Sequence, residues 1–230
     1  MKKHLITVAA AITAISIPTI CTAAPPRPGA YVSGFIGASM ARDTDATTVD
    51  YFAPIITTFN DRIEFDPGIN VGGTGGYDFG FFRLEGELSY KYAEMKAINE
   101  RNSGARYSSI DGNLGALAMM ANAFFDLHNN TPVTPYFGGG AGLAVLYLSD
   151  TFGTNTTTGS RDFIYSEADD TVFAYQVGAG VEIALNRQLS LDLGYRYFGT
   201  STATFDKDVT RTTELKLESH NMAVGLRVKF

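Results

Sequence analysis

The residues of this sequence best placed to interact chemically are charged residues at alternating positions, which could form ion pairs with one another. Residues 82–92 carry Arg83, Glu85, Glu87 and Lys91 on one side of a two-residue repeat, with mainly leucine and aromatic side chains on the other. A repeat of two is that of a β-strand, so these charges share one face. Each would cost a few kcal/mol against lipid near the bilayer midplane. We therefore expect them to form ion pairs in a polar interior.

The same alternation recurs later in the chain and supplies matching charges. Glu182 lies in the repeat of residues 173–185, and Asp192 and Arg196 lie in that of residues 189–197. The predicted lumen charge network consists of Arg83, Glu85, Glu87, Lys91, Glu182, Asp192, Arg196, Arg227 and Lys229. Because its cations and carboxylates nearly balance, we expect a packed interior with little or no conductance. A narrow ion path is the alternative.

Glu218, Ser219 and His220 have the residue types of a hydrolytic relay. Strict alternation puts Ser219 on the opposite strand face from its two neighbours, so the three are not expected to act together. The other histidines, His4 and His128, are too scattered to predict a metal site. We therefore expect no catalytic, cofactor-binding or metal-binding residues.

Eight segments could position these side chains as membrane-crossing strands, each about ten residues long or slightly longer. They are residues 31–40, 68–77, 82–92, 117–127, 135–148, 173–185, 189–197 and 221–230. The first two segments are rich in glycine, and their facing is left open. We include them mainly because a closed barrel of this kind needs an even number of strands.

The connections between these segments alternate between short and long. Short turns are expected at residues 78–80, 128–134 and 186–188, and long polar loops at residues 41–67, 93–112, 149–171 and 200–214. This alternation is typical of barrels with short periplasmic turns and long external loops. The predicted fold is all-β, an eight-stranded antiparallel up-and-down transmembrane β-barrel. Its first and last strands must meet, because lipid cannot satisfy an open sheet edge.

The amino-terminal residues predict an export signal. Lys2 and Lys3 precede a mostly apolar stretch, residues 5–20, and Ala23 ends a small-residue cleavage site. We expect residues 1–23 to be a signal peptide and residues 24–230 to be the barrel domain. The formal charge is −6, and removal of the two lysines makes it −8, which argues against a nucleic-acid partner. The only cysteine precedes the expected cut, so no disulfide is expected.

Three runs resemble a family of eight-stranded outer-membrane surface antigens, the opacity-type, OmpX-like and OmpA-barrel-like proteins. They are Tyr136-Phe137-Gly138-Gly139-Gly140-Ala141-Gly142, residues 180–197 and residues 221–230. The resemblance implies a barrel in the outer membrane of a Gram-negative bacterium, among its lipids and lipopolysaccharide. It also implies insertion by the barrel assembly machinery, which reads a terminal aromatic residue such as Phe230. No cofactor is implied.

The resemblance implies no single activity, since members serve as adhesins, surface antigens, membrane–wall tethers or proteins of unknown role. No peptidoglycan-binding domain follows in this sequence, so we do not expect a wall tether. The leading hypothesis is a non-enzymatic surface barrel with a structural, adhesive or antigenic role. One alternative is a small pore or solute channel, and another is a barrel enzyme that modifies lipid A.

The long loops are the candidates for binding a host or surface ligand. Residues 41–67 and 149–171 are both acidic, and the first is also rich in aromatic and isoleucine side chains. Acidic loops could hold divalent cations near lipopolysaccharide or meet a basic host surface. The other interpretation is that they are solvated loops whose aromatic residues cap the barrel or extend its strands above the membrane.

Overall fold

The computed structural model describes residues 28–52, 55–208 and 211–230. The predicted signal peptide, residues 1–23, lies outside these ranges, so its prediction stays untested. No helix in the described part of the chain has the length and apolar character needed to cross a membrane.

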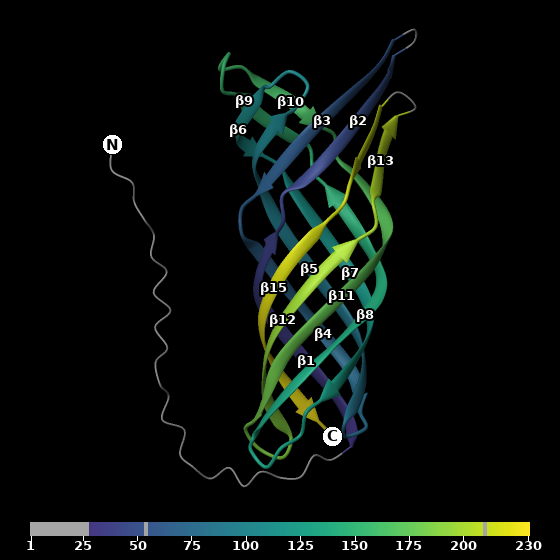
Figure 1. Cartoon of the computed structure of the whole chain (residues 1–230), viewed down its shortest axis with the longest axis vertical. Helices are drawn as coiled ribbons and strands as arrows, with labels where there is room; N and C mark the ends of the chain where they lie inside the picture. Colours follow the sequence, from purple (N-terminus) through teal and green to yellow (C-terminus); the bar gives the residue numbers. More distant parts are fainter. Residues whose placement is uncertain (1–27, 53–54, 209–210) are drawn as a thin grey trace, which may run out of the picture.

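Eight long strands form a closed ring around a central lumen (Figure 1). They are β1 (Gly29–Ala41), β4 (Gly68–Asp78), β5 (Phe82–Glu100), β7 (Asn113–Asp126), β8 (Val133–Leu148), β11 (Ala168–Ala184), β12 (Leu189–Thr200) and β15 (Glu218–Lys229). Each pairs antiparallel with its neighbours in chain order. The ring closes where β1 pairs with β15, from Tyr31 opposite Lys229 to Ala41 opposite Ser219. The predicted eight-stranded antiparallel barrel is confirmed.

Seven shorter strands continue the sheet beyond the barrel, at the end opposite the short turns (Figure 1). They are β2 (Thr44–Phe52), β3 (Ile55–Phe65), β6 (Arg106–Asp111), β9 (Thr151–Asn155), β10 (Arg161–Tyr165), β13 (Ala203–Asp208) and β14 (Arg211–Leu215). They arise from the four connections expected to be polar loops, and that expectation was wrong for most of their residues. Extension of the barrel strands beyond the membrane, which was part of one interpretation of these segments, is observed.

The outer wall of the ring is apolar and the inner wall carries the polar residues. On β1 and β4, whose facing the sequence left open, Tyr31, Ser39 and Asn70 point inward and are buried. Ile36 and Val71 point outward and are exposed. The alternation of strand side chains therefore holds around the whole ring.

The lumen is divided into two halves with different chemistry. β7 passes through both, because its inward residues change from Ala116 and Met120 to Asn122 and Asp126 along the strand. We call the part beside the short turns the short-turn half and the part beneath the added strands the extended half. The extended half is filled by an apolar cluster that includes Ile63, Phe65, Met95, Ile98, Leu114, Leu146, Leu148, Val172, Phe198, Phe205, Leu215 and Leu217.

A buried polar contact joins the added strands across the extended end. The Tyr165 hydroxyl on β10 donates a hydrogen bond to Asp61 Oδ2 on β3 at 2.6 Å. Burial raises the pKa of the Asp61 carboxyl above its ordinary value, while the hydrogen bond from Tyr165 acts in the opposite direction. The contact fixes the β9–β10 hairpin against β3.

Candidate functional site: the lumen charge network

The short-turn half of the lumen holds the charged residues predicted from alternation. Arg83, Glu85, Glu87 and Lys91 lie on the inward face of β5 and are almost completely buried. Charges removed from water in this way need partners, since an unpaired buried charge is strongly unfavourable. The contacts of each side chain therefore decide what the site is.

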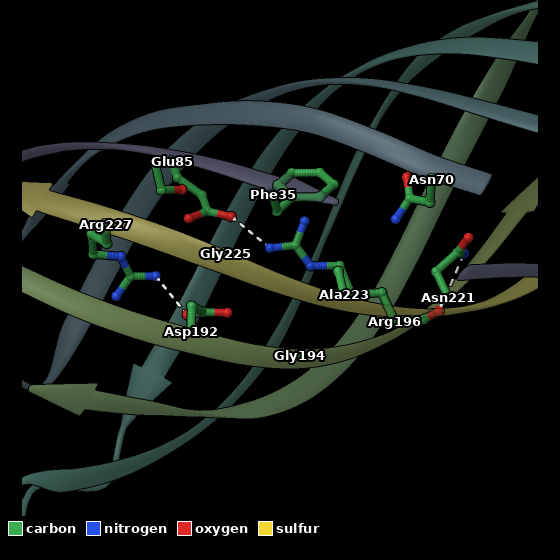
Figure 2. Close-up of a pocket in the computed structure, with 11 residues that line it drawn as sticks. Phe35, Asn70, Glu85, Asp192, Gly194, Arg196, Asn221, Ala223, Gly225 and Arg227 are labelled. Carbon is green, nitrogen blue, oxygen red and sulfur yellow. Dashed lines mark hydrogen bonds and ion pairs between the residues drawn. The ribbon is translucent and has the colours of Figure 1, made fainter. Parts of the chain in front are cut away.

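The first group of partners lies close to the short turns. Arg227 Nη2 lies 3.1 Å from Asp192 Oδ2, and Arg227 Nη1 pairs with Glu182. Lys229 Nζ lies 3.0 Å from Asp78 Oδ2 and 3.2 Å from Glu182 Oε1. These two cations from β15 therefore link carboxylates of β4, β11 and β12 (Figure 2 shows the contact between Arg227 and Asp192).

The second group is centred on Arg196 of β12, which reaches across the lumen to β5 (Figure 2). Arg196 Nη2 lies 3.3 Å from Glu85 Oε1, and Nη1 donates to Glu87. Amides from two other strands also donate to Glu87, Asn122 at 3.0 Å and Gln176 at 2.8 Å. Strands on opposite sides of the ring are thus joined by hydrogen bonds through its centre, which opposes collapse or widening of the barrel.

Arg83 is held differently, by aromatic rings as well as by charge. It is 0% exposed, and its guanidinium carbon lies 4.2 Å from the centroid of the Tyr136 ring and 5.0 Å from that of Phe124. Its Nη1 lies 3.1 Å from Asp126 Oδ1 and 3.6 Å from Glu182 Oε2, without hydrogen-bond geometry. Electrostatic attraction and cation–π contacts, rather than directed hydrogen bonds, therefore hold this side chain.

Lys91 lies apart from the other eight predicted residues, each of which forms an ion pair. Its Nζ donates to Ser89 Oγ at 2.9 Å and lies 4.3 Å from the centroid of the Phe198 ring. Among the described residues, no carboxylate lies within ion-pair distance of this nitrogen. The structure therefore places Lys91 at the boundary between the two halves of the lumen.

Two carboxylates that the predicted network lacked, Asp78 and Asp126, also point into it. The inward facing of Asp126 could be read from the alternation of residues 117–127, whereas that of Asp78 could not, because β4 is rich in glycine. The partnership of Arg83 with Tyr136 and Phe124 had no signal in the sequence. It depends on which strands become neighbours and on their register.

A cavity of about 20 Å³ lies in the middle of this network (Figure 2). Phe35, Asn70, Asp192, Arg196 and Asn221 are among the residues that line it. A volume of this size accommodates about one water molecule. The site can therefore hold a bridging water, but it is too small for an organic solute.

The residues considered for a catalytic relay do not converge. Glu218 and His220 face the outer wall, whereas Ser219 is buried on the inner face and accepts a hydrogen bond from Asn221 Nδ2 at 3.0 Å. The Nδ1 atom of His220 is hydrogen-bonded to the Tyr195 hydroxyl at 2.7 Å. In the described ranges, no three or more His, Cys, Asp or Glu side chains are grouped so that they could hold a metal ion.

Phe230 lies at the closing seam of the barrel. Its backbone N–H donates to the carbonyl oxygen of Ala30 at 3.0 Å, and its side chain is 78% exposed. The ring is therefore available to another molecule while the backbone is fixed against β1.

Comparison with known proteins gives a consistent picture of the fold. The family model described as outer membrane protein beta-barrel domain matches residues 7–230. The solved structure of the outer membrane protein OprG from Pseudomonas aeruginosa is similar with a TM-score of 0.53 and 13% sequence identity. That match covers 88% of this chain and 96% of OprG, and it concerns the fold alone.

Two curated relatives match parts of the sequence. Outer membrane protein PagN of Salmonella typhimurium is 27% identical over 123 residues, which are 48% of this chain and 48% of PagN. An uncharacterized protein of Brucella abortus is 42% identical over 84 residues, which are 34% of this chain and 28% of that protein. The chain thus spans about half the length of PagN and less of the Brucella protein.

Proposed function

Because the chain belongs to the outer membrane protein β-barrel family and is an integral protein of the bacterial outer membrane, we propose that it is a non-conducting, non-enzymatic surface barrel. In this proposal the ring anchors the molecule in the membrane, and the added strands present a binding surface with an adhesive or antigenic role. The observation that carries it is the filled lumen.

Both halves of the lumen are filled by side chains, and this supports the absence of a transport path. The short-turn half contains the ion-paired network around Arg196 and Arg227, and its cavity has the size of about one water molecule. The extended half contains the apolar cluster, in which Leu146 and Phe198 are fully buried. An ion that moved through the lumen would have to displace charged pairs and then enter a dry apolar layer, which is strongly unfavourable.

The construction of the added strands supports a binding role. β2, β3 and β14 pair with one another in the same sheet, so the surface is held by backbone hydrogen bonds as well as by side chains. Arg62 and Arg101 also form ion pairs with Asp45 at 3.5 Å and 2.7 Å. A rigid surface binds a partner with less loss of conformational entropy than a flexible loop.

The acidic character of residues 149–171 favours a basic partner or a divalent cation held near lipopolysaccharide.

We further propose that the exposed ring of Phe230 is recognised by the barrel assembly machinery. A Phe230→Ala variant should then be secreted but inserted slowly into the outer membrane. Normal insertion of that variant would contradict this role.

Recordings of single channels in planar lipid bilayers test the central proposal. The purified protein is first shown to be a folded barrel by heat-modifiable gel mobility. We expect it to give no steady conductance under conditions in which a general porin, as the positive control, gives open channels. Steady conductance by the folded protein would overturn the proposal and favour the pore alternative. Unchanged mass spectra of lipid A with and without the protein are expected for a non-enzymatic barrel.

A further inference from the structure

Two cations share one carboxylate on the outer wall of the barrel. Arg42 Nη1 lies 2.8 Å from Glu218 Oε2, and Lys216 Nζ lies 2.8 Å from Glu218 Oε1. Each oxygen of the carboxylate is therefore occupied by a different cation, and the group keeps one formal positive charge in excess. The two cationic side chains are 56% and 55% exposed, so both retain donors that can reach another anion.

Four rings lie beside these charges and form an aromatic platform across β11, β12 and β15. The ring of His220 lies 5.4 Å from that of Tyr197 and 6.1 Å from that of Tyr195, and Tyr197 lies 6.4 Å from Tyr175. The ring of Tyr175 lies over Gly199, where a Cβ would come within 2.6 Å of it. Together with the hydrogen bond between Tyr195 and His220, this packing fixes the platform before any ligand arrives.

The position of the group matches the outer surface of the membrane. Along β15 from His220 toward the short turns, the outward residues are Met222, Val224 and Leu226, all apolar and exposed. The apolar wall therefore ends at His220 and Glu218. Because short turns face the periplasm in barrels of this type, this end of the wall lies at the headgroups of the outer leaflet.

We propose that Arg42, Lys216 and the aromatic platform form a binding site for the phosphorylated sugar headgroup of an outer-leaflet glycolipid, namely lipopolysaccharide. The two cations donate charge-assisted hydrogen bonds to a phosphate. The platform packs against the apolar face of a sugar ring, in the zone where amphipathic rings are favoured. This proposal rests on the proposed function, because it assumes that the added strands are external.

The charge arrangement elsewhere on the wall supplies a matched control. Lys96 on β5 is 59% exposed, which is close to the values for Arg42 and Lys216. It is paired one-to-one with Asp66 at 3.6 Å, so that pair has no excess positive charge. Loss of Lys96 should therefore leave the binding of lipopolysaccharide unchanged.

The test titrates the purified full-length protein in mild detergent with lipopolysaccharide and measures the dissociation constant by native mass spectrometry. We expect the double variant Arg42→Gln/Lys216→Gln to bind at least about tenfold more weakly than the wild type, which corresponds to about 1.4 kcal/mol. The Lys96→Gln variant should bind like the wild type. Equal binding by wild type and double variant, or an equal loss in Lys96→Gln, would overturn the proposal.

A third variant gives a readout of the opposite sign, which misfolding cannot imitate. Glu218→Gln removes the carboxylate that competes for both cations, so it should bind lipopolysaccharide more tightly than the wild type. Weaker binding by this variant, when heat-modifiable gel mobility shows that it is folded, would contradict the assignment of the two cations.

The chemistry of the ligand is tested with two other lipids. Dephosphorylated lipopolysaccharide should bind to the wild type as weakly as native lipopolysaccharide binds to the double variant. Phosphatidylglycerol, which has a phosphate but no sugar ring, should bind more weakly than lipopolysaccharide, and equal binding would overturn the sugar part of the proposal. Conductance in bilayers would instead contradict the proposed function, so the two failures are distinguishable.

Discussion

The short-turn half and the extended half of the lumen are filled by opposite chemistries within one ring of strands. β5 belongs to both, since its inward face changes from Glu85 and Glu87 to Met95 and Ala97 along a single strand. The polar half depends on directed contacts between particular atoms, as in the pairing of Arg196 with β5. The apolar half depends on volume and on exclusion of water. A polar lumen therefore does not by itself make a channel, because the second layer closes it.

The largest expected effect comes from removing a buried charge in the polar half. Arg83→Met leaves Asp126 buried without its cation, and it should lower the free energy of unfolding by about 3–5 kcal/mol. Urea titration in phospholipid vesicles measures this loss. The control is Arg161→Met, which breaks an exposed pair with Asp111 at 3.4 Å and should cost about 0–1 kcal/mol. Equal losses would contradict the importance assigned to the buried pair.

Truncation of a side chain in the apolar half should lower the free energy of unfolding somewhat less than Arg83→Met does. Leu146 is 0% exposed in the apolar cluster, so Leu146→Ala should lower the free energy of unfolding by about 2–4 kcal/mol through lost burial and a cavity. Leu143→Ala, on the outward face of the same strand, is the matched control, since acyl chains can fill the space that it leaves. If both variants lost the same stability in urea titrations, the extended half would not be a close-packed core.

Lys91 at the boundary sharpens the comparison further. Because its nitrogen contacts Ser89 and the Phe198 ring rather than a carboxylate, Lys91→Met should leave stability unchanged or raise it by about 1 kcal/mol. The same urea titration measures the change. A loss as large as that of Arg83→Met would show that Lys91 belongs to the ion-paired network after all.

The smallest expected effect is a local dependence on pH in the added strands. A carboxyl group whose pKa is raised on folding stabilises the fold at pH values below its unfolded pKa, and this stabilisation is lost as pH rises through the folded pKa. Burial raises the pKa of Asp61 from 3.8, so amides of β3 and β10 should exchange hydrogen more slowly in mildly acidic solution than at pH 7.5, after correction for intrinsic rates. Asp61→Asn should remove this difference.

If hydrogen exchange in β3 and β10 of the Asp61→Asn variant kept its full dependence on pH, a group other than Asp61 would cause that dependence. The matched control is Asp162→Asn on β10. The Asp162 carboxylate accepts its hydrogen bond from the exposed Ser160 hydroxyl at 3.1 Å and has no bond to Tyr165, so that substitution should leave the dependence unchanged.

The ring of strands could be predicted from sequence because lipid outside and charge inside impose a repeat of two. Residues 82–92 carry that signal in full, and the same reasoning placed the facing of Glu182, Asp192 and Arg196 before any pairing was known. The glycine-rich strands β1 and β4 have too few side chains for such a signal, so their facing depended on the register with β15 and β5.

The extended half could not be predicted because its signal is divided among many short strands. Thr44, Ala46 and Thr48 point inward on β2, yet their neighbours are polar enough that the segment reads as a loop. The apolar cluster becomes visible only when Ile63 of β3 and Leu215 of β14 are brought together with it. Contacts between residues far apart in sequence are set by topology, which composition does not encode.

The seam between β1 and β15 has a consequence for the order in which the molecule can form. Tyr31 and Lys229, which face each other there, are separated by almost the whole described chain. Hairpins such as β11–β12 can assemble from neighbouring residues, but the seam must wait until both distant strands are present. Contacts of such long range are slow to form. Until then each strand at the seam keeps a free edge that can capture another chain, so a chaperone in the periplasm has most to protect at these two edges.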